Sequence, residues 1–363
     1  MRNRRGKTTR KYKTGKGVKQ GCPLSPAIFS AILNEALSEY AAEGKPKGVT
    51  ITKDGQLKPL KKTDDEYAEE EHELSHLLFA DDIVLVAEGW EAMQQNLTRL
   101  DEILGKFGLQ LSEKKTKVME INNPKKWEVD QPELTLRGKT VQKVDEFVYL
   151  GHVISADARD TKDIARRLQL GNMALGRLRR TLWDKSLPKV LRTKLVTAFI
   201  YPIISYGSET WCTSVRDCDT LRIWWMKVLR MINRTKWYHK TLDEEVLKTL
   251  AHAKHLTTMV TSRRLRYAGH IYRYPTERFA RKSLFACWPA KKVGRGGHNF
   301  PKWNAQVSKL LLEYDLDLSM PKKEYRAQLD VIYEQADLPV TQGKEKQAQP
   351  QPKEPETVAA DEE

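Results

Sequence analysis

The sequence predicts an α+β fold in which strands and helices of the first half are followed by a helical second half. Two apolar stretches, 77–80 and 83–86, flank the pair Asp81-Asp82 and have the length of short buried strands joined by a tight turn. Apolar residues recur every three or four positions over 93–107, which predicts a helix. After Asp160 the helical spacing of apolar residues continues, and basic residues occupy another face.

The segment before these strands predicts a turn followed by a helix. Three glycines between positions 15 and 21 mark the turn, Ser25 can cap the helix, and Pro26 suits its first position. We expect this helix, up to Tyr40, to pack behind the sheet that carries Asp81-Asp82. Residues 42–75 have the composition of a long loop or ribbon, and their acidic run is typical of a solvated face rather than of a metal site.

The segment after these strands predicts further short strands. Gly108 can end the helix over 93–107. Strands are then expected around 109–111, 134–136 and 147–154.

Composition favours a nucleic-acid partner and excludes a membrane-spanning chain. Lys and Arg outnumber Asp and Glu by 63 to 48, a surplus typical of proteins that contact phosphate backbones. The four cysteines show no CxxC pairing and no signal peptide is visible, so we expect a nuclear or cytoplasmic protein. The longest apolar stretch, Leu195–Tyr206, is too short to span a bilayer.

The pair Asp81-Asp82 is the predicted chemical centre. Two adjacent carboxylates at a turn between apolar strands repel each other, and a cation at the site relieves that repulsion. Oxygen ligands suit Mg²⁺, and paired Mg²⁺ ions are what nucleotidyl transfer uses to activate a 3′-hydroxyl and stabilise the leaving oxygen. Taken alone, however, an Asp-Asp pair is more often an ordinary turn.

Four segments in order resemble the motifs of reverse transcriptases from non-LTR retrotransposons of the LINE type, in particular RTE-like elements. The segment Gly17–Pro26 resembles motif B, and Phe79-Ala80-Asp81-Asp82 resembles motif C. The segment Gly108–Ser112, with Lys115-Thr116 after it, resembles motif D, although Ser112 stands where asparagine is commoner. Tyr149-Leu150-Gly151 resembles the primer grip.

The resemblance continues beyond these motifs and implies a domain order. Tyr201–Trp211 is similar to the thumb of such enzymes, and 265–273 and 294–296 are similar to their C-terminal region. The implied fold is a partial right-hand polymerase palm, an antiparallel sheet with packed helices, followed by a helical thumb and a helical C-terminal region. The expected boundaries are palm 1–155, thumb 156–245, basic helical extension 246–320, and a mostly disordered tail 321–363.

The resemblance also implies roles for single residues. Asp81 would bind the catalytic Mg²⁺ ions with support from Asp82. Lys115 would be the acid for the departing pyrophosphate, unless it is a solvated lysine in a charged run. The nucleotide and template pocket would be shaped by Gln20, Gly21, Ser25 and Pro26, and the primer end would be held by Tyr149, Leu150 and Gly151.

The basic helices would grip the template–primer duplex through its phosphates. The implied partners are an RNA template with a DNA primer, or an RNA/DNA duplex. A zinc site is disfavoured because histidines and cysteines lack close pairing. The expected nucleic-acid contacts are Arg166, Arg177, Arg180, Arg230, Arg234, Arg264 and Arg273.

One catalytic carboxylate of the implied site is missing from the sequence. The family takes its first metal-binding aspartate from a strand before motif B, yet the first acidic residue here is Glu35. We therefore expect a fragment that does not polymerise alone and that lacks the N-terminal half of its polyprotein. Two alternatives are a catalytically inactive nucleic-acid-binding remnant and a group II intron-type reverse transcriptase, which shares motifs B to D.

Overall fold

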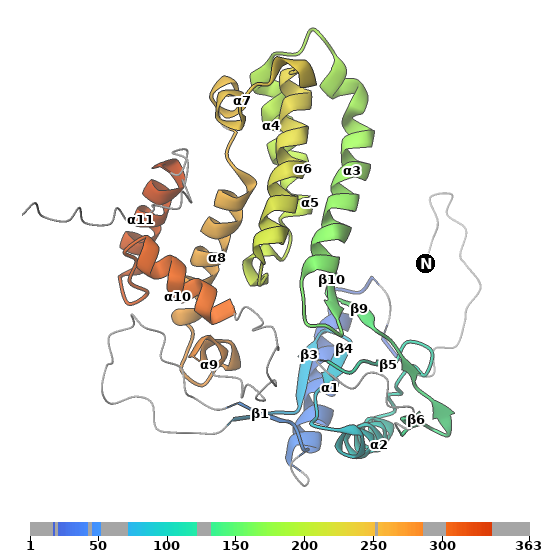
Figure 1. Cartoon of the computed structure of the whole chain (residues 1–363). Coiled ribbons are helices and arrows are strands. Elements are labelled where there is room, and N and C mark those ends of the chain that lie inside the picture. Colours follow the sequence, from blue (N-terminus) through green and yellow to red (C-terminus); the bar gives the residue numbers. More distant parts are fainter. Residues whose placement is uncertain are drawn as a thin grey trace, which may run out of the picture.

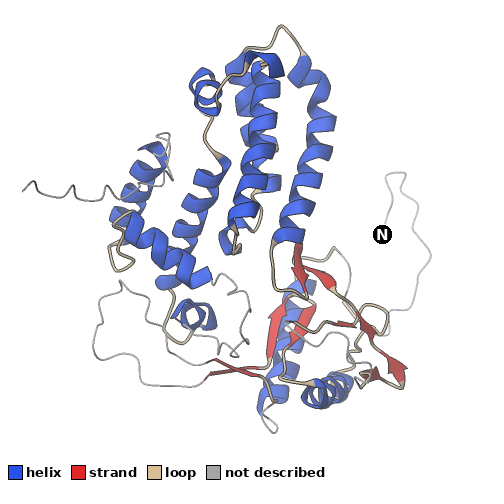
Figure 2. Ribbon diagram, viewed as in Figure 1, coloured by secondary structure: helices blue, strands red, loops and turns tan. Residues whose placement is uncertain are grey.

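The computed structural model describes residues 17–18, 21–42, 46–51, 72–121, 132–250, 253–285 and 303–335. The strands gather in one part of the molecule, and a tall helical bundle rises from it with a smaller helical body at its side (Figures 1 and 2). No helix within these ranges is long and apolar enough to cross a membrane.

The strand-containing part is built around two helices, α1 (Ser25–Ala42) and α2 (Trp90–Lys106). The helix α2 ends where predicted: Gly108 has a φ of 72°, and Leu109 N–H donates to Leu104 O. The strands are β1 (Val49–Ile51), β2 (His72–Leu74), β3 (His76–Phe79), β4 (Asp82–Leu85), β5 (Lys117–Val118), β6 (Thr135–Leu136), β7 (Lys139–Thr140), β8 (Gln142–Lys143), β9 (Glu146–Tyr149) and β10 (His152–Ser155).

These strands correct the expectation of one antiparallel sheet. In the described residues they form five separate pairs, and the pair of β5 with β8 is parallel. The strand expected at 109–111 is also absent, although Leu109 and Leu111 do pack against the core. The apolar spacing of these two leucines indicates that they are buried. An extended segment can bury such side chains without pairing with another strand.

The hairpin of β3 and β4 confirms the predicted position of the aspartate pair. Phe79 pairs with Asp82, so Ala80 and Asp81 form the turn. The helix α1 packs behind this hairpin, because Ile83 and Leu85 join the core cluster formed by α1 and α2.

The bundle consists of helices that follow β10 and share one core. Its largest fully buried side chains are Trp211 and Trp225. Ser214 and Asp217 cap α6 reciprocally, which fixes where that helix begins. The elements are α3 (Thr161–Trp183), α4 (Lys189–Phe199), α5 (Tyr201–Ile204), η1 (Ser208–Thr210), α6 (Val215–Asn233), η2 (Trp237–His239) and α7 (Asp243–Thr249).

The smaller helical body has a core of its own and extends into the expected tail. It contains α8 (Leu256–Tyr272), α9 (Phe279–Phe285), α10 (Trp303–Glu313) and α11 (Lys322–Gln335). The helix α11 corrects the expectation of disorder from 321 onward: Tyr325 and Leu329, four residues apart, are buried against α8 and α10. This short apolar stripe is hidden among charged residues. The rest of the expected tail, from 336, lies outside the described residues.

Candidate active site

The tip of the β3–β4 hairpin presents two exposed carboxylates. Asp81 lies in the turn and Asp82 opens β4, and both are exposed. Within the described part of the chain, neither carboxylate takes part in a hydrogen bond or an ion pair, which leaves their oxygens available as ligands. Ala80 adopts a φ of 54° at this tip, a backbone region that favours glycine and that often accompanies functional turns.

The two faces of the hairpin differ in what covers them. Side chains alternate along a strand, so Leu77 and Phe79 share a face with Asp82, away from α1. The opposite face carries His76, whose ring lies 5.5 Å from that of Tyr40 in α1. Phe79 remains 59% exposed, so the face that carries Asp82 is open.

The phenol of Tyr149 is influenced by the charge of one of these carboxylates. Burial, and then the negative charge of Asp82, raise the pKa of the Tyr149 phenol. The tyrosine that ends β9 therefore lies within electrostatic range of the aspartate that opens β4.

The turn after Tyr149 is held by the bundle. Leu150 and Gly151 have φ values of 48° and 80°, so the β9–β10 hairpin closes with two left-handed residues. The Leu150 carbonyl accepts a hydrogen bond from the Tyr206 hydroxyl at 2.8 Å. The Gly151 carbonyl accepts from Arg166 at 2.9 Å and also from Arg167.

The predicted nucleotide-pocket residues lie at the start of α1. Gly21 has a φ of 82°, Ser25 is buried at the first position of the helix, and Pro26 is exposed beside it. Gln20 lies outside the described residues. Lys115 is exposed in a turn, and its backbone N–H donates to Ser112 O at 3.0 Å. In the described residues, no hydrogen bond or ion pair joins the Lys115 ammonium to the Asp81-Asp82 turn.

Three of the predicted nucleic-acid contacts are exposed. Arg177 and Arg180 lie on the surface of α3. Arg234 is exposed at the end of α6, where it also donates to the carbonyls of Trp183 and Asp184. These three side chains are available to a phosphate backbone.

The other predicted arginines are engaged inside the protein. Arg264 is 5% exposed and donates to Trp211 O at 2.7 Å, so its predicted phosphate contact is wrong: the guanidinium satisfies a buried carbonyl instead. Arg273 donates to Met320 O at 2.8 Å and lies over the Tyr325 ring, which gives it a structural role. Arg230 is ion-paired with Asp243 and is half-buried.

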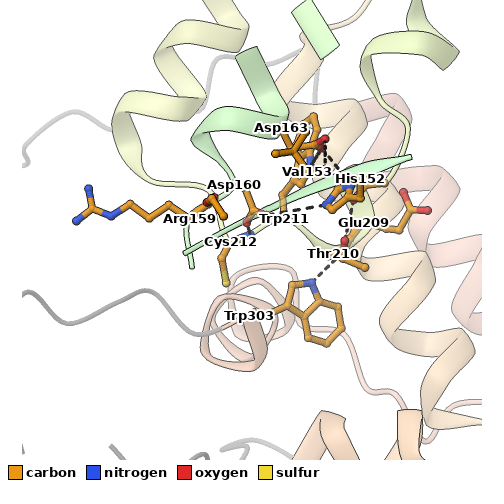
Figure 3. A network of polar contacts seen from close by, with 12 residues as sticks. His152, Val153, Arg159, Asp160, Asp163, Glu209, Thr210, Trp211, Cys212 and Trp303 are labelled. Carbon is orange, nitrogen blue, oxygen red and sulfur yellow. Dashed lines mark hydrogen bonds and ion pairs between the residues drawn. The ribbon is translucent and has the colours of Figure 1, made fainter. Parts of the chain in front are cut away.

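A buried polar network at the base of α3 was missed from the sequence (Figure 3). Asp163, with 0% of its side chain exposed, accepts from Trp211 Nε1 at 3.0 Å and from the Val153 backbone at 2.9 Å. His152 Nδ1 lies 3.0 Å from the same carboxylate. The network ties β10 to α3 and to the end of η1. An acidic residue in the first turn of an otherwise basic helix was the available signal.

No cluster of three or more His, Cys, Asp or Glu side chains suited to holding a metal ion occurs among the described residues. The candidate metal ligands that the structure presents are the two carboxylates of the hairpin tip. Their chemistry suits a hard cation, because both donors are oxygens and both are open to solvent.

A comparison with known protein families identifies the part of the chain that carries this hairpin. Residues 2–154 match the family model described as reverse transcriptase (RNA-dependent DNA polymerase), so this part of the chain is a reverse-transcriptase domain.

Three relatives indicate the kind of genetic element from which such proteins come. The chain is 27% identical to an uncharacterised transposon-derived protein of Caenorhabditis elegans, over 67% of this chain and 88% of that protein. It is 24% identical to the Pol polyprotein of an R2 retrotransposable element of Drosophila melanogaster, over 84% of this chain and 30% of that polyprotein. A third relative, the R2 Pol polyprotein of Nasonia vitripennis, is 28% identical over 39% of this chain and 12% of its own length.

The matched family model and these transposon-derived and R2 relatives together support a reverse transcriptase of a non-LTR retrotransposon. It spans less than a third of the two insect polyproteins. The finer resemblance to RTE-like elements stays a prediction.

Proposed function

We propose that this chain is the part of an RNA-directed DNA polymerase that holds the primer end against a pair of metal-binding aspartates. The observation that carries the proposal is the β3–β4 hairpin, whose tip presents Asp81 and Asp82 exposed to solvent. The negative charge of Asp82 also contributes to the raised pKa of Tyr149 in the predicted primer grip, which supports the proposal. The reaction would be templated addition of nucleotides to a primer 3′ end.

In this function Asp81 and Asp82 would hold Mg²⁺, which supplies charge stabilisation for the attacking and leaving oxygens when bound. Both carboxylates are exposed, and in the described residues neither is neutralised by a basic partner, which supports this role. Gly21, with Gln20 before it, would approach the nucleotide and template. Lys115 would neutralise or protonate the departing pyrophosphate.

The bundle would act as the thumb that holds an RNA/DNA duplex. Arg177 and Arg180 are exposed on α3 and would contact phosphates without reading sequence. The retrotransposon relatives support nucleic acid as the partner class.

A second candidate is a duplex-binding protein without turnover. The observation that favours it is that Asp81 and Asp82 come from one turn, whereas two metal ions need ligands held around the site. Residues 1–34 contain no acidic side chain that could complete it. We therefore propose that the chain alone binds duplex and does not extend a primer.

Primer extension with a recessed DNA primer on an RNA template, labelled nucleotide and Mg²⁺ separates these candidates. We expect binding but no extension by the chain alone. Extension should appear only when a polypeptide that supplies an aspartate-bearing first palm strand is added, and Asp81→Asn should then abolish it. Extension by the chain alone that Asp81→Asn removes would favour the complete enzyme over the duplex-binding candidate. Absence of duplex binding would contradict both candidates.

A further inference from the structure

Side chains of the helical bundle hold the Leu150-Gly151 turn in place through hydrogen bonds. Both of its carbonyls are taken by the bundle: Leu150 O by the Tyr206 hydroxyl, and Gly151 O by Arg166 and Arg167. A left-handed two-residue turn exposes its carbonyl groups, so three side-chain donors to two of them hold its position from outside the hairpin. The β9–β10 hairpin alone does not set where this turn lies.

Two of these donors, Arg167 and Tyr206, stack on each other and form one unit. The Arg167 guanidinium lies 4.4 Å from the centroid of the Tyr206 ring, an arrangement that favours a cation over an aromatic face. Arg167 is 6% exposed, and its Nε lies 3.7 Å from the buried carboxylate of Asp163. That carboxylate also accepts from Val153 and Trp211, so the unit is anchored to both β10 and η1.

The unit is placed to act on the reaction centre through the residue before the turn. Tyr149 precedes Leu150 directly and lies within electrostatic range of Asp82. A displacement of the turn would therefore move Tyr149 relative to the aspartate pair. Because the bundle holds this turn, the position of Tyr149 relative to Asp81 and Asp82 depends on the bundle.

We infer that Tyr206 and Arg167 are positioning residues, which hold the Leu150-Gly151 turn so that a bound primer 3′ end is kept in register with Asp81 and Asp82. The inference rests on the proposed function, because it requires a primer end at this site. The residues act through backbone carbonyls and need no contact with nucleic acid themselves.

Residues that only stabilised the fold would make the same contacts. The test must therefore separate an effect on protein stability from an effect on the position of the primer 3′ end. Tyr206→Phe removes the hydroxyl that bonds Leu150 O and keeps the ring beneath Arg167. Tyr206 is 49% exposed, so this change leaves the buried core intact. Tyr238→Phe is the matched control, because Tyr238 is 53% exposed and lies in η2, outside this unit.

The probe is an RNA/DNA hybrid with a recessed primer that carries 2-aminopurine at its 3′ end and a fluorescent label at its distal end. Anisotropy of the distal label measures total affinity in the full chain, and 2-aminopurine emission measures the environment of the terminal base. Thermal melting of each variant is recorded alongside. We expect the wild type and Tyr238→Phe to change the 2-aminopurine emission on binding.

For Tyr206→Phe we expect duplex affinity within about threefold of the wild type, because phosphate contacts dominate affinity, together with loss of the change at the terminal base. Wild-type emission that does not change although duplex is bound would overturn the inference, as would a Tyr206→Phe response equal to the wild type. The second result leaves the proposed function standing, whereas the first would also contradict the proposed holding of the primer end. Failure of the wild type to bind any duplex would overturn both.

Discussion

Gly207 lies where the chain leaves α5 and passes the ring of His152. Its φ is 73°, and a Cβ at this position would lie 2.6 Å from His152 Nδ1. His152 cannot easily retreat, because its Nδ1 also lies 3.0 Å from the buried Asp163 carboxylate. The absence of a side chain at this position is therefore a requirement of the junction between strands and bundle.

Gly207→Ala should lower the free energy of unfolding by about 2–4 kcal/mol, from a strained backbone and a steric clash together. Gly176→Ala is the matched control, because Gly176 lies inside α3 and a Cβ there would have no neighbouring atom within 4 Å. Alanine there should be neutral or stabilising by up to about 1 kcal/mol. Chemical denaturation of the two variants measures the difference, and equal stabilities would show that the His152 contact is dispensable.

Cys212, at the same junction, makes the stability of the fold depend on pH. Burial, followed by the charge of Asp160, raises the pKa of its thiol to about 11. An unfolded cysteine titrates near pH ~8.5. Because the unfolded chain then loses the proton first, this thiol contributes stability that is present below pH ~8.5 and is lost as the pH rises toward ~11.

The same shift should suppress the reactivity of the thiol. In a chain with Cys22→Ser, Cys218→Ser and Cys287→Ser, we expect alkylation of Cys212 at pH ~8 to be about two orders of magnitude slower in the folded than in the urea-unfolded protein, since the thiolate is the nucleophile. Equal rates in the two states would contradict the raised pKa.

At the scale of elements, local pattern predicted the hairpin, α2 and its glycine end, but not how the strands pair. The apolar stretches beside Asp81-Asp82 and the spacing over 93–107 depend on near neighbours, and both predictions are confirmed. The pairing of β5 with β8 joins segments more than twenty residues apart in the sequence, and no local pattern reports such a partner.

The basic residues of the helices show the same limit. The basic content of their segments predicted Arg264 and Arg180 alike as phosphate contacts, yet Arg264 is buried against Trp211 O and Arg180 is exposed. Helices of similar basic content can carry buried and exposed arginines. Which of them is buried depends on which face of the helix other elements pack against.

The exposed arginines of α3 give a prediction for binding. Replacing Arg177 and Arg180 together by Ala should reduce the slope of log K against log salt by about 2, because each phosphate contact contributes about 0.9. Lys322→Ala with Lys323→Ala is the control, since both lysines are exposed on α11, outside the bundle. Filter binding to an RNA/DNA hybrid across salt concentrations measures the slopes, and an equal reduction in the control would remove α3 from the interface.

At the scale of the whole molecule, the loop around η1 is where the parts meet. Strand β10 reaches it through His152, which lies against Asp163 of α3, and that carboxylate accepts a hydrogen bond from Trp211. The smaller helical body reaches it through Trp303, whose Nε1 donates to Glu209 O at 2.8 Å (Figure 3). Gln306 of α10 donates to Thr213 O at 2.8 Å on the same loop. The segment Tyr201–Trp211, which resembles the thumb of related enzymes, thus joins strand β10, the bundle and the smaller helical body.

This joint fixes how a duplex should lie. α3 follows β10, contacts the Leu150-Gly151 turn through Arg166 and Arg167, and extends away from the strands (Figure 1). Under the proposed function, which puts the primer end at Asp81 and Asp82, the duplex should therefore follow α3 away from the carboxylates. The 23 residues of α3 span about 35 Å at ~1.5 Å per residue, or about ten base pairs at ~3.4 Å each.

Hydroxyl-radical footprinting of a recessed RNA/DNA hybrid bound by the full chain tests this placement most directly. We expect protection that begins at the primer 3′ end and extends about ten base pairs into the duplex, and that shortens when Arg177 and Arg180 are replaced by Ala. Protection spread evenly along the hybrid, or confined to the single-stranded template, would show that the duplex does not follow α3 from the carboxylate turn.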